Sequence, residues 1–343
     1  MDSAFIIEKS VFIVVIFAFT MLMAMYSTWA ERKVAAFLQD RVGPNRAGWG
    51  GLLQPLADGM KLFAKEEFEP NTKNRFLFFV GPAIAMSTAL MTSAVIPWGD
   101  KLEIFGRTVI LQATDIDVSL LYIFGVVSVG VYGIMIGGWA SNNKFSLMGA
   151  VRAASQMVSY EVAMGLSMIA LLMMTGTLSL KEISVQQHGM SWNVFYQPLS
   201  FLIFLICAFA ETNRTPFDLA ECESELIGGY HTEYSSMKMG FYLFAEYANM
   251  FISSTIIAVL FFGGYNYPGM SWALENWGVN IANVIGIGAL FIKLCFFIFF
   301  FMWIRWTIPR FRYDQLMNLG WKILIPLSIV NIIITGICIL AFK

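Results

Sequence analysis

Eight long apolar runs, separated by shorter polar connections, dominate the hydrophobic pattern of this chain of 343 residues. About 20 helical residues, at a rise of about 1.5 Å each, cross the ~30 Å hydrocarbon core of a bilayer. The runs therefore predict an all-α polytopic membrane protein with about eight transmembrane helices in a single membrane domain, 1–343. The predicted spans are 6–30, 76–98, 118–139, 153–175, 198–214, 240–264, 281–306 and 323–342, of which the fifth is the shortest.

The first run, 6–30, has a signal peptide as its rival interpretation because it is N-terminal. A signal peptide has a basic flank and an apolar core of about 7–15 residues. Here the flank carries Asp2 and Glu8 beside Lys9, and the apolar run is longer. A membrane span is therefore favoured.

The connection between the first two spans predicts an amphipathic helix over about 51–66. Pro55 fits only the first turn of such a helix. Because one face is apolar, we expect the helix to lie along the membrane surface; packing against other helices of the chain is an equally open and compatible interpretation. The apolar face consists of Trp49, Leu52, Leu53, Leu56, Met60 and Phe63, and the opposite face of Gln54, Asp58, Lys61 and Lys65.

A segment dense in acidic residues, 211–246, lies between the fifth and sixth spans, and its first part forms a predicted acidic loop, 211–239. The segment carries seven of the 23 acidic residues, and only Arg214 and Lys238 oppose them within it. Ionisable groups at bilayer depth cost about 2.5–3.5 kcal/mol each on insertion scales and usually mark ion or proton pathways. The segment is therefore a candidate for such a pathway.

Two acids lie deep within predicted spans: Glu161 is about 12 Å and Glu246 about 9 Å from the cytoplasmic end of its span at helical rise. Glu211 closes the fifth span, and Glu221 and Glu225 share a face if their segment is helical. Burial and like charges both raise the pKa of a carboxyl group, which permits proton transfer at neutral pH. The alternative is that the acids of the loop face the cytoplasm or pair with basic residues of a partner.

Composition supports the membrane assignment and excludes other classes of function. Only 13% of the residues are charged, against about 25% in soluble domains, and the mean hydropathy is +0.67. Four scattered cysteines and two distant histidines show no ligand spacing for zinc, haem or an iron–sulfur cluster. No glycine-rich phosphate-binding motif is present. The sequence thus predicts no metal, flavin or iron–sulfur centre in this chain, and the net charge of −1 gives no sign of nucleic-acid binding.

The distribution of basic residues predicts the orientation in the membrane. Sixteen of the 22 lysines and arginines fall in the connections after spans 1, 3, 5 and 7, five fall on the other side, and Lys293 lies inside span 7. Positive charge favours the cytoplasmic side. Both termini are therefore expected outside, and the amphipathic helix and the acidic loop are expected on the same cytoplasmic face.

A resemblance to a known family rests on two segments, ERKVAAFLQDRVGPNRAGWGGLLQPLADGMKLFAKEEFEP and ETNRTPFDLAECESELIGGYHTEYSSMKMGFYLFAEY. They resemble the signature regions of the family that contains the H subunit of bacterial NADH–quinone oxidoreductase and its counterpart in mitochondrial NADH dehydrogenase. The resemblance covers essentially the whole chain. It implies a membrane component of respiratory complex I in a bacterial inner membrane, with quinone as the bound substrate. Its implied partners are other membrane subunits and the peripheral quinone-site and iron–sulfur subunits.

The resemblance also implies roles for individual residues. It assigns Glu31, Arg32, Arg41, Arg46 and Phe217 to the quinone tunnel and the peripheral-arm contact. It assigns a proton path to Asp58, Glu161, Glu211, Glu221, Glu223, Glu225 and Glu246. Some family members carry an acid in the third span, whereas 118–139 has none; a water or a neighbouring subunit is the substitute expected there.

Three alternatives to this assignment remain at the level of sequence. The membrane component of an energy-converting hydrogenase shares the family's fold and acidic loop, but its donor reduces protons. A stand-alone proton-coupled transporter usually shows internal repeats or broken helices, and none is visible in this chain. A passive membrane anchor does not account for carboxylates at lipid depth.

Overall fold

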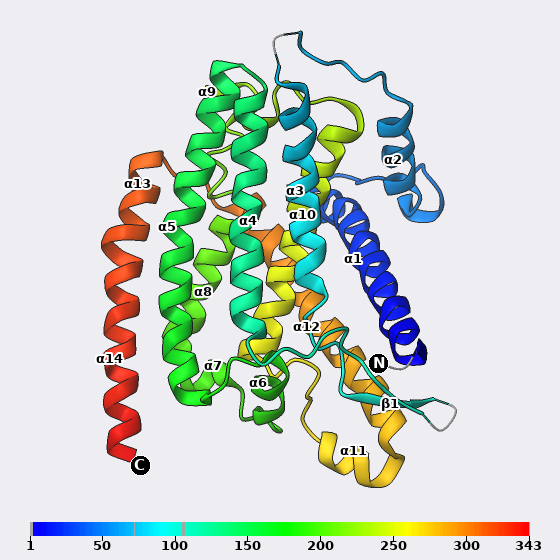
Figure 1. Ribbon diagram of the computed structural model, residues 1–343, viewed down its shortest axis with the longest axis vertical. Helices are drawn as coiled ribbons and strands as arrows, with labels where there is room; N and C mark the ends of the chain where they lie inside the picture. Colours follow the sequence, from blue (N-terminus) through cyan, green and yellow to red (C-terminus); the bar gives the residue numbers. More distant parts are fainter. Residues whose placement is uncertain (1–2, 72, 105–106, 343) are drawn as a thin grey trace.

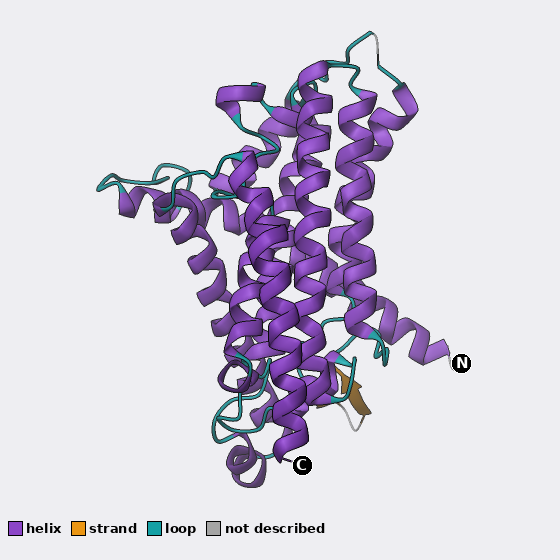
Figure 2. Ribbon diagram, turned by 90° about the vertical axis from the view of Figure 1, so that its left-hand side faces the viewer, coloured by secondary structure: helices purple, strands orange, loops and turns teal. Residues whose placement is uncertain are grey.

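The computed structural model describes residues 3–71, 73–104 and 107–342, and almost all regular structure in them is helical (Figure 2). Seven helical segments of the described chain are long and apolar enough to cross a membrane. The all-α polytopic membrane fold is thereby confirmed. The segments are α1 (Ser3–Leu38), α3 (Arg75–Ser93), α4 (Ser119–Ala140), α5 (Lys144–Thr175), α10 (Ser236–Phe261), α12 (Val279–Thr307) and a C-terminal run of α13 (Tyr313–Asn318), the π-helical η3 (Leu319–Leu324) and α14 (Ile325–Phe342).

The fifth predicted span is shorter than the others. α8 (Pro198–Glu211) has 14 residues, which give about 21 Å at helical rise and fall short of the ~30 Å hydrocarbon core. The chain turns at Asn213, whose φ is 50°, ahead of Pro216, which has no amide hydrogen to continue a helix. Residues 212–214 that follow the helix are buried. The loop after α8 therefore begins inside the bundle.

Two other helices extend further than hydropathy indicates. α1 continues to Leu38, past the predicted end at 30, so Glu31 and Arg32 belong to this helix. α5 begins at Lys144, nine residues before the predicted start at 153. The Asn143 side chain caps its first turn by accepting a hydrogen bond of 2.9 Å from a backbone N–H. Both extensions carry polar residues, which a hydropathy pattern does not count as part of a span.

The predicted amphipathic helix is α2 (Gln54–Ala64), preceded by the 3-10 turn η1 (Trp49–Gly51). Pro55 occupies its first turn and is buried. α2 packs against α1 and α10 (Figure 1), whereas Met60 and Phe63 on its apolar face remain exposed. This helix thus combines packing on its neighbours with an exposed apolar face.

Short elements close the two ends of the bundle (Figure 1). The termini lie toward one end, and α2 lies at the other, with α9 (Glu223–Leu226) and η2 (Gly229–His231). Near the end with the termini are α6 (Leu180–Gln186), α7 (Asn193–Tyr196), α11 (Met270–Trp277) and an antiparallel hairpin of β1 (Lys101–Ile104) and β2 (Arg107–Ile110).

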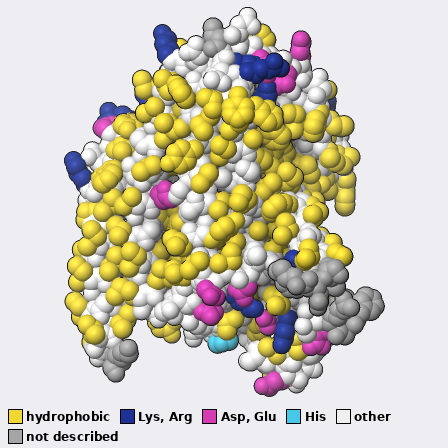
Figure 3. Space-filling view, in the orientation of Figure 1, with side chains coloured by type: hydrophobic (Ala, Val, Ile, Leu, Met, Phe, Trp, Pro, Cys, Tyr) yellow, Lys and Arg dark blue, Asp and Glu magenta, His cyan; other side chains and the backbone are white. Residues whose placement is uncertain are grey.

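α10 is the central helix and packs against α1, α3 and α12. α3 and α4 approach each other so closely that a Cβ atom at Gly133 would lie 2.8 Å from the backbone nitrogen of Ala85. Such small-residue contacts are typical of helices that associate in a membrane. On the face shown in Figure 3, hydrophobic side chains cover the middle of the molecule and charged side chains gather mainly at its two ends.

Lys293, which lies near the middle of the seventh predicted span, is held by backbone oxygens. Its Nζ donates hydrogen bonds of 2.7, 2.8 and 2.6 Å to the carbonyls of Phe262, Gly264 and Asn266. These carbonyls lie just after the end of α10. A lysine has three donors, so this ammonium is fully paired and fixes α12 to the end of α10.

Candidate functional site

A network of charged side chains joins three helices and one loop inside the bundle. One Glu31 carboxylate oxygen on α1 lies 2.5 Å from Arg305 of α12, and the other lies 3.8 Å from Arg214. Arg214 also lies 3.1 Å from a carboxylate oxygen of Glu246 on α10. Tyr230 donates a hydrogen bond of 2.7 Å to Glu246. Because Glu31, Arg214 and Glu246 are all buried, each charge depends on the others for compensation.

The loop after α8 places Arg214 at the centre of this network. Gln156 of α5 donates hydrogen bonds of 2.7 and 2.8 Å to the carbonyls of Ala210 and Phe217. These bonds fix the loop on both sides of the arginine. Since α8 is short, the guanidinium reaches the helix interfaces and not the solvent.

The surroundings of Arg214 keep it charged. The Tyr247 ring lies over the guanidinium, with its centroid 4.2 Å away. Burial opposes the charge, but Glu246, Tyr247 and Glu31 outweigh it and raise the pKa of Arg214. Arg214 is therefore a permanent positive charge between two carboxylates.

An open pocket of about 450 Å³, which we name the lateral pocket, lies between α1, α2 and α10. Arg32 and Asp58 form an ion pair of 2.7 Å on its wall. Tyr247 lines the pocket and also covers Arg214, so the pocket and the charged network share a side chain. The wall consists of Met25, Thr28, Arg32, Pro55, Asp58, Gly59, Lys61, Leu62, Lys65, Met239, Gly240, Leu243, Phe244 and Tyr247.

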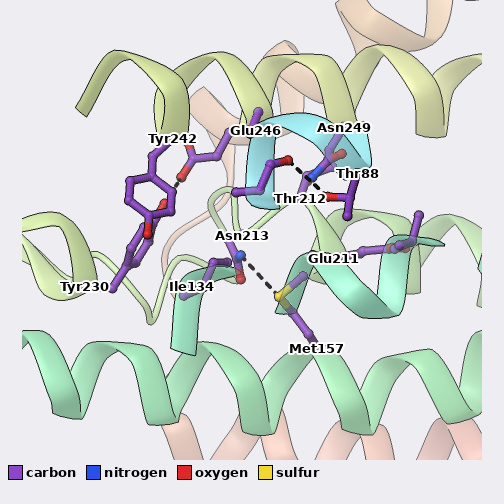
Figure 4. A pocket seen from close by; sticks show the side chains of 14 residues that line it. Thr88, Ile134, Met157, Glu211, Thr212, Asn213, Tyr230, Tyr242, Glu246 and Asn249 are labelled. Carbon is purple, nitrogen blue, oxygen red and sulfur yellow. Dashed lines mark hydrogen bonds between the residues drawn. The ribbon is translucent and has the colours of Figure 1, made fainter. Parts of the chain in front are cut away.

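A smaller cavity of about 30 Å³, the inner cavity, lies between α3, α4, α5, α8 and α10. Figure 4 shows Glu246 and Glu211 on its wall, together with Tyr230 and Tyr242. Glu246 of the charged network and Glu211, a further carboxylate, therefore line the same cavity.

Glu161 faces α4, the helix that corresponds to the third predicted span. The Ser128 hydroxyl of α4 donates a hydrogen bond to a Glu161 carboxylate oxygen. A hydroxyl of this helix, which carries no acid of its own, therefore contacts Glu161.

The acids of the loop diverge instead of sharing one face. α9 includes only Glu223–Leu226, so Glu221 precedes the helix and the condition for a common face with Glu225, a helix over both residues, is not met. Glu225 pairs with Arg152 at 2.6 Å and Glu221 lies 3.6 Å from His231. The Glu223 side chain lies outside the described part of the structure. Basic residues of this same chain therefore pair with acids of the loop.

Asp218 and Glu221 lie in surroundings that favour their neutral forms. Burial raises the pKa of Asp218 to about 6, although Arg310 lies 3.0 Å away and lowers it. Burial, with repulsion from Glu246 and Asp218, raises the pKa of Glu221 well above its usual value. Asp218 therefore exchanges its proton nearer to neutrality than a free aspartate does, and Glu221 keeps its proton to a higher pH than a free glutamate does.

The raised pKa of Asp218 predicts a pH-dependent contribution to stability. The folded state binds this proton more tightly than the unfolded state, so the contribution is present below the ordinary pKa of 3.8 and is lost as pH rises through about 6. Its full size is about 3 kcal/mol. The difference in unfolding free energy between Asp218→Asn and wild type should therefore shift in favour of the variant as pH rises from 4 to 7. Melting temperatures of the purified protein in detergent at both pH values test this. An unchanged difference would contradict it.

Three residues assigned by resemblance lie apart from this network. Arg41 and Arg46 are exposed on the loop before α2, where the Arg41 Nε donates to the Gln39 side chain at 2.7 Å. Phe217 is buried against the rings of Tyr160 and Phe311, with centroids 5.4 and 5.5 Å away, and is not on the lateral pocket wall. The two arginines remain available to a partner, whereas Phe217 packs the loop.

Sequence reasoning did not assign Arg214, Arg305, Tyr230, Tyr247 or Arg310 to the site. A local signal existed for three of them, since Arg214 and Tyr230 lie in the acidic loop and Tyr247 follows Glu246 directly. Arg305 and Arg310 come from a segment far from that loop in the chain. Within the described ranges, no group of three or more His, Cys, Asp or Glu side chains is arranged to hold a metal ion.

The fold and the site define a multi-pass helical membrane protein in which buried ion pairs adjoin an open, largely apolar pocket. Residues 11–336 match the family model described as NADH dehydrogenase. The chain is 87% identical over 343 residues to the H subunit of NADH-quinone oxidoreductase from Flavobacterium psychrophilum, covering 100% of both chains. It is 64% identical over 340 residues to the first H subunit of the same enzyme from Cytophaga hutchinsonii, with 98% of each chain covered.

A more distant relative gives the same result. The chain is 46% identical over 338 residues to the first H subunit of NADH-quinone oxidoreductase from Geobacter sulfurreducens, covering 95% of this chain and 93% of that protein. This chain therefore belongs to the family of H subunits of NADH–quinone oxidoreductase, an enzyme complex. The resemblance stated from the two sequence segments is confirmed.

Proposed function

We propose that this chain, within the assembled complex, admits a membrane quinone through the lateral pocket and couples its reduction to proton translocation. Reduction of a quinone to a quinol takes up two electrons and two protons. The electrons come from NADH through peripheral iron–sulfur subunits, and the present chain supplies the binding walls and the proton-transferring groups.

The shared position of Tyr247 carries this proposal. Its ring lies on the pocket wall and over Arg214, which contacts both Glu31 and Glu246. A change of charge or protonation in the pocket therefore acts on buried carboxylates through one layer of side chains. Electrostatic interactions are stronger in such a water-poor interior than in solvent.

The lateral pocket suits a quinone in size and chemistry. Its volume of about 450 Å³ lies in the range of about 300–1,000 Å³ that is usual for ligand pockets. Its apolar walls accept an isoprenoid tail, and the Arg32–Asp58 pair supplies polar groups for the oxygens of the headgroup.

The proposed proton path runs through the carboxylates around the inner cavity. Two contacts support it: Glu246 and Glu211 line the same cavity, and Glu161 accepts a hydrogen bond from Ser128. The proposed feeding groups are Asp58 at the pocket and Glu221, Glu223 and Glu225 in the loop. Arg41 and Arg46, exposed before α2, are the proposed contact with the peripheral arm.

The proposed location is a bacterial inner membrane with both termini outside. The termini lie toward the end of the bundle opposite α2 and α9 (Figure 1). The connections at the terminal end hold few of the basic residues, which supports a cytoplasmic position for α2 and the acidic loop. Peripheral subunits then approach the face that carries Arg41 and Arg46.

Leu243→Trp tests the pocket. The larger side chain should fill part of the lateral pocket between α10 and α2. The rate of NADH oxidation with a long-tailed quinone should then fall about 10-fold, because a misplaced substrate reacts far more slowly. NADH oxidation by a soluble acceptor that takes electrons upstream should be unchanged. The control is the same substitution at Leu202, which is 52% exposed on α8. Equal quinone reduction in both variants would remove the lateral pocket from the quinone route.

A further inference from the structure

A third cavity, the outer cavity, adjoins the inner cavity along α10. Its volume is about 20 Å³ and its wall reaches from Glu211 to Leu120 and Ile256, near the ends of α4 and α10 that lie away from α2. Glu211, Asn249 and Val127 belong to the walls of both cavities. Among these three, Asn249 is the only neutral polar side chain.

Asn249 occupies a particular place on α10. It follows Glu246 by three residues and precedes Ser253, another residue of the outer cavity wall, by four, so the three side chains share one face of the helix. An asparagine side chain has two donors and an acceptor. In the described part of the chain, the Asn249 side chain makes no hydrogen bond to protein. Its polar atoms are thus free to bind water.

Both cavities are large enough for water. About 10–15 Å³ of free space suffices for one molecule, which must also find two to four polar partners. The wall of the inner cavity offers Glu246, Glu211, Asn249 and Thr88, as Figure 4 shows. The Thr88 hydroxyl donates to the carbonyls of Ile84 and Ala85 at 3.0 and 3.1 Å, so its lone pair is left for a water.

We propose that Asn249 positions a short file of waters through which Glu246 and Glu211 exchange a proton. The first water accepts a proton from the carboxyl group of Glu246, each water passes one of its own protons to the next, and the last donates one to the carboxylate of Glu211. One O–H bond forms and one breaks on each water, so the waters are unchanged and one proton has moved. Asn249 takes up no proton; it is a positioning residue. This inference rests on the proposed function, since it needs a proton path through Glu246.

The alternative role for Asn249 is packing between helices. A packing role depends on volume, whereas a water-binding role depends on polarity. Asn249→Leu keeps most of the volume and removes all hydrogen bonding. Asn249→Ser removes volume but leaves a hydroxyl and room for one more water. The two roles therefore predict opposite rankings of these variants.

The experiment compares purified complexes that carry Asn249→Leu, Asn249→Ser and, as a control, Asn276→Leu on the exposed face of α11. Asn249→Leu should lower kcat for NADH–quinone turnover about 10-fold, less than the ~10²–10⁴ contributed by a direct acid–base group. Its KM for quinone should be unchanged, and its proton translocation should fall with the rate. Asn249→Ser should stay within about two-fold of wild type, and Asn276→Leu should match wild type.

Two outcomes would overturn the inference: unaltered kcat and proton translocation in Asn249→Leu, or an Asn249→Ser complex as slow as Asn249→Leu. Glu246→Gln, measured in parallel, separates the inference from the proposal on which it rests. A slow Glu246→Gln with a normal Asn249→Leu removes only the positioned waters. A normal Glu246→Gln removes the proton path itself.

Discussion

Arg214→Leu should reduce NADH-driven quinone reduction by the assembled complex by about 10²-fold or more, because it leaves two buried carboxylates without their common counter-charge. In this variant Glu31 still has Arg305 at 2.5 Å, but Glu246 loses its positively charged partner and keeps only the Tyr230 hydrogen bond. Removing one partner of a buried pair costs about 3–5 kcal/mol of stability. Turnover and thermal stability of the purified complex measure both effects.

Two further variants decide whether the loss comes from this position. Arg214→Lys keeps the charge but has a single ammonium in place of two guanidinium arms, so an intermediate turnover is expected. Arg75→Leu removes an exposed arginine at the start of α3 and should change neither turnover nor stability appreciably. If Arg214→Leu turns over as fast as Arg75→Leu, the network has no part in quinone chemistry.

Glu246→Gln has the second large expected effect. Glutamine retains the size of the side chain and can still accept the Tyr230 hydrogen bond, but it cannot carry the proton between the lateral pocket and the inner cavity. A positioned acid–base group contributes about 10²–10⁴-fold, so coupled NADH–quinone turnover should fall by about 10²-fold. The rate of NADH oxidation with quinone in sealed membranes gives the result.

The matched control for Glu246→Gln is Glu233→Gln. Glu233 belongs to the same acidic segment and accepts a hydrogen bond of 2.5 Å from the Asn143 side chain, which glutamine can also accept. Its turnover should stay near that of wild type. Comparable losses in the two variants would mean that the segment responds to any lost charge and that Glu246 has no special role.

The helical membrane fold could be predicted from sequence because the length and apolar character of each run can be read from consecutive residues. Runs such as the one that forms α4 leave the chain no other way to satisfy its backbone in lipid. α8 was harder, since its end depends on the turn at Asn213 and Pro216 inside the bundle. The start of α5 and the end of α1 were misplaced because polar residues continue those helices beyond the apolar part.

The acids of the candidate site could be found from sequence, but their partners could not. Glu161 and Glu246 were visible because a carboxylate inside an apolar run is costly. Arg305 is far from Arg214 in the chain, and only the packing of α12 beside α1 brings it to Glu31. Asn249 carried no signal at all, since a neutral amide in a membrane helix has no charge to account for.

Under the proposed function, the buried carboxylates of this chain transmit the free energy of quinone reduction to protons. The most direct test is the number of protons moved per NADH oxidised, measured in proteoliposomes that contain wild-type complex or the Glu246→Gln variant. We expect the residual turnover of Glu246→Gln to move fewer protons per NADH than wild type. A variant that matches wild type in both rate and protons per NADH would contradict the account.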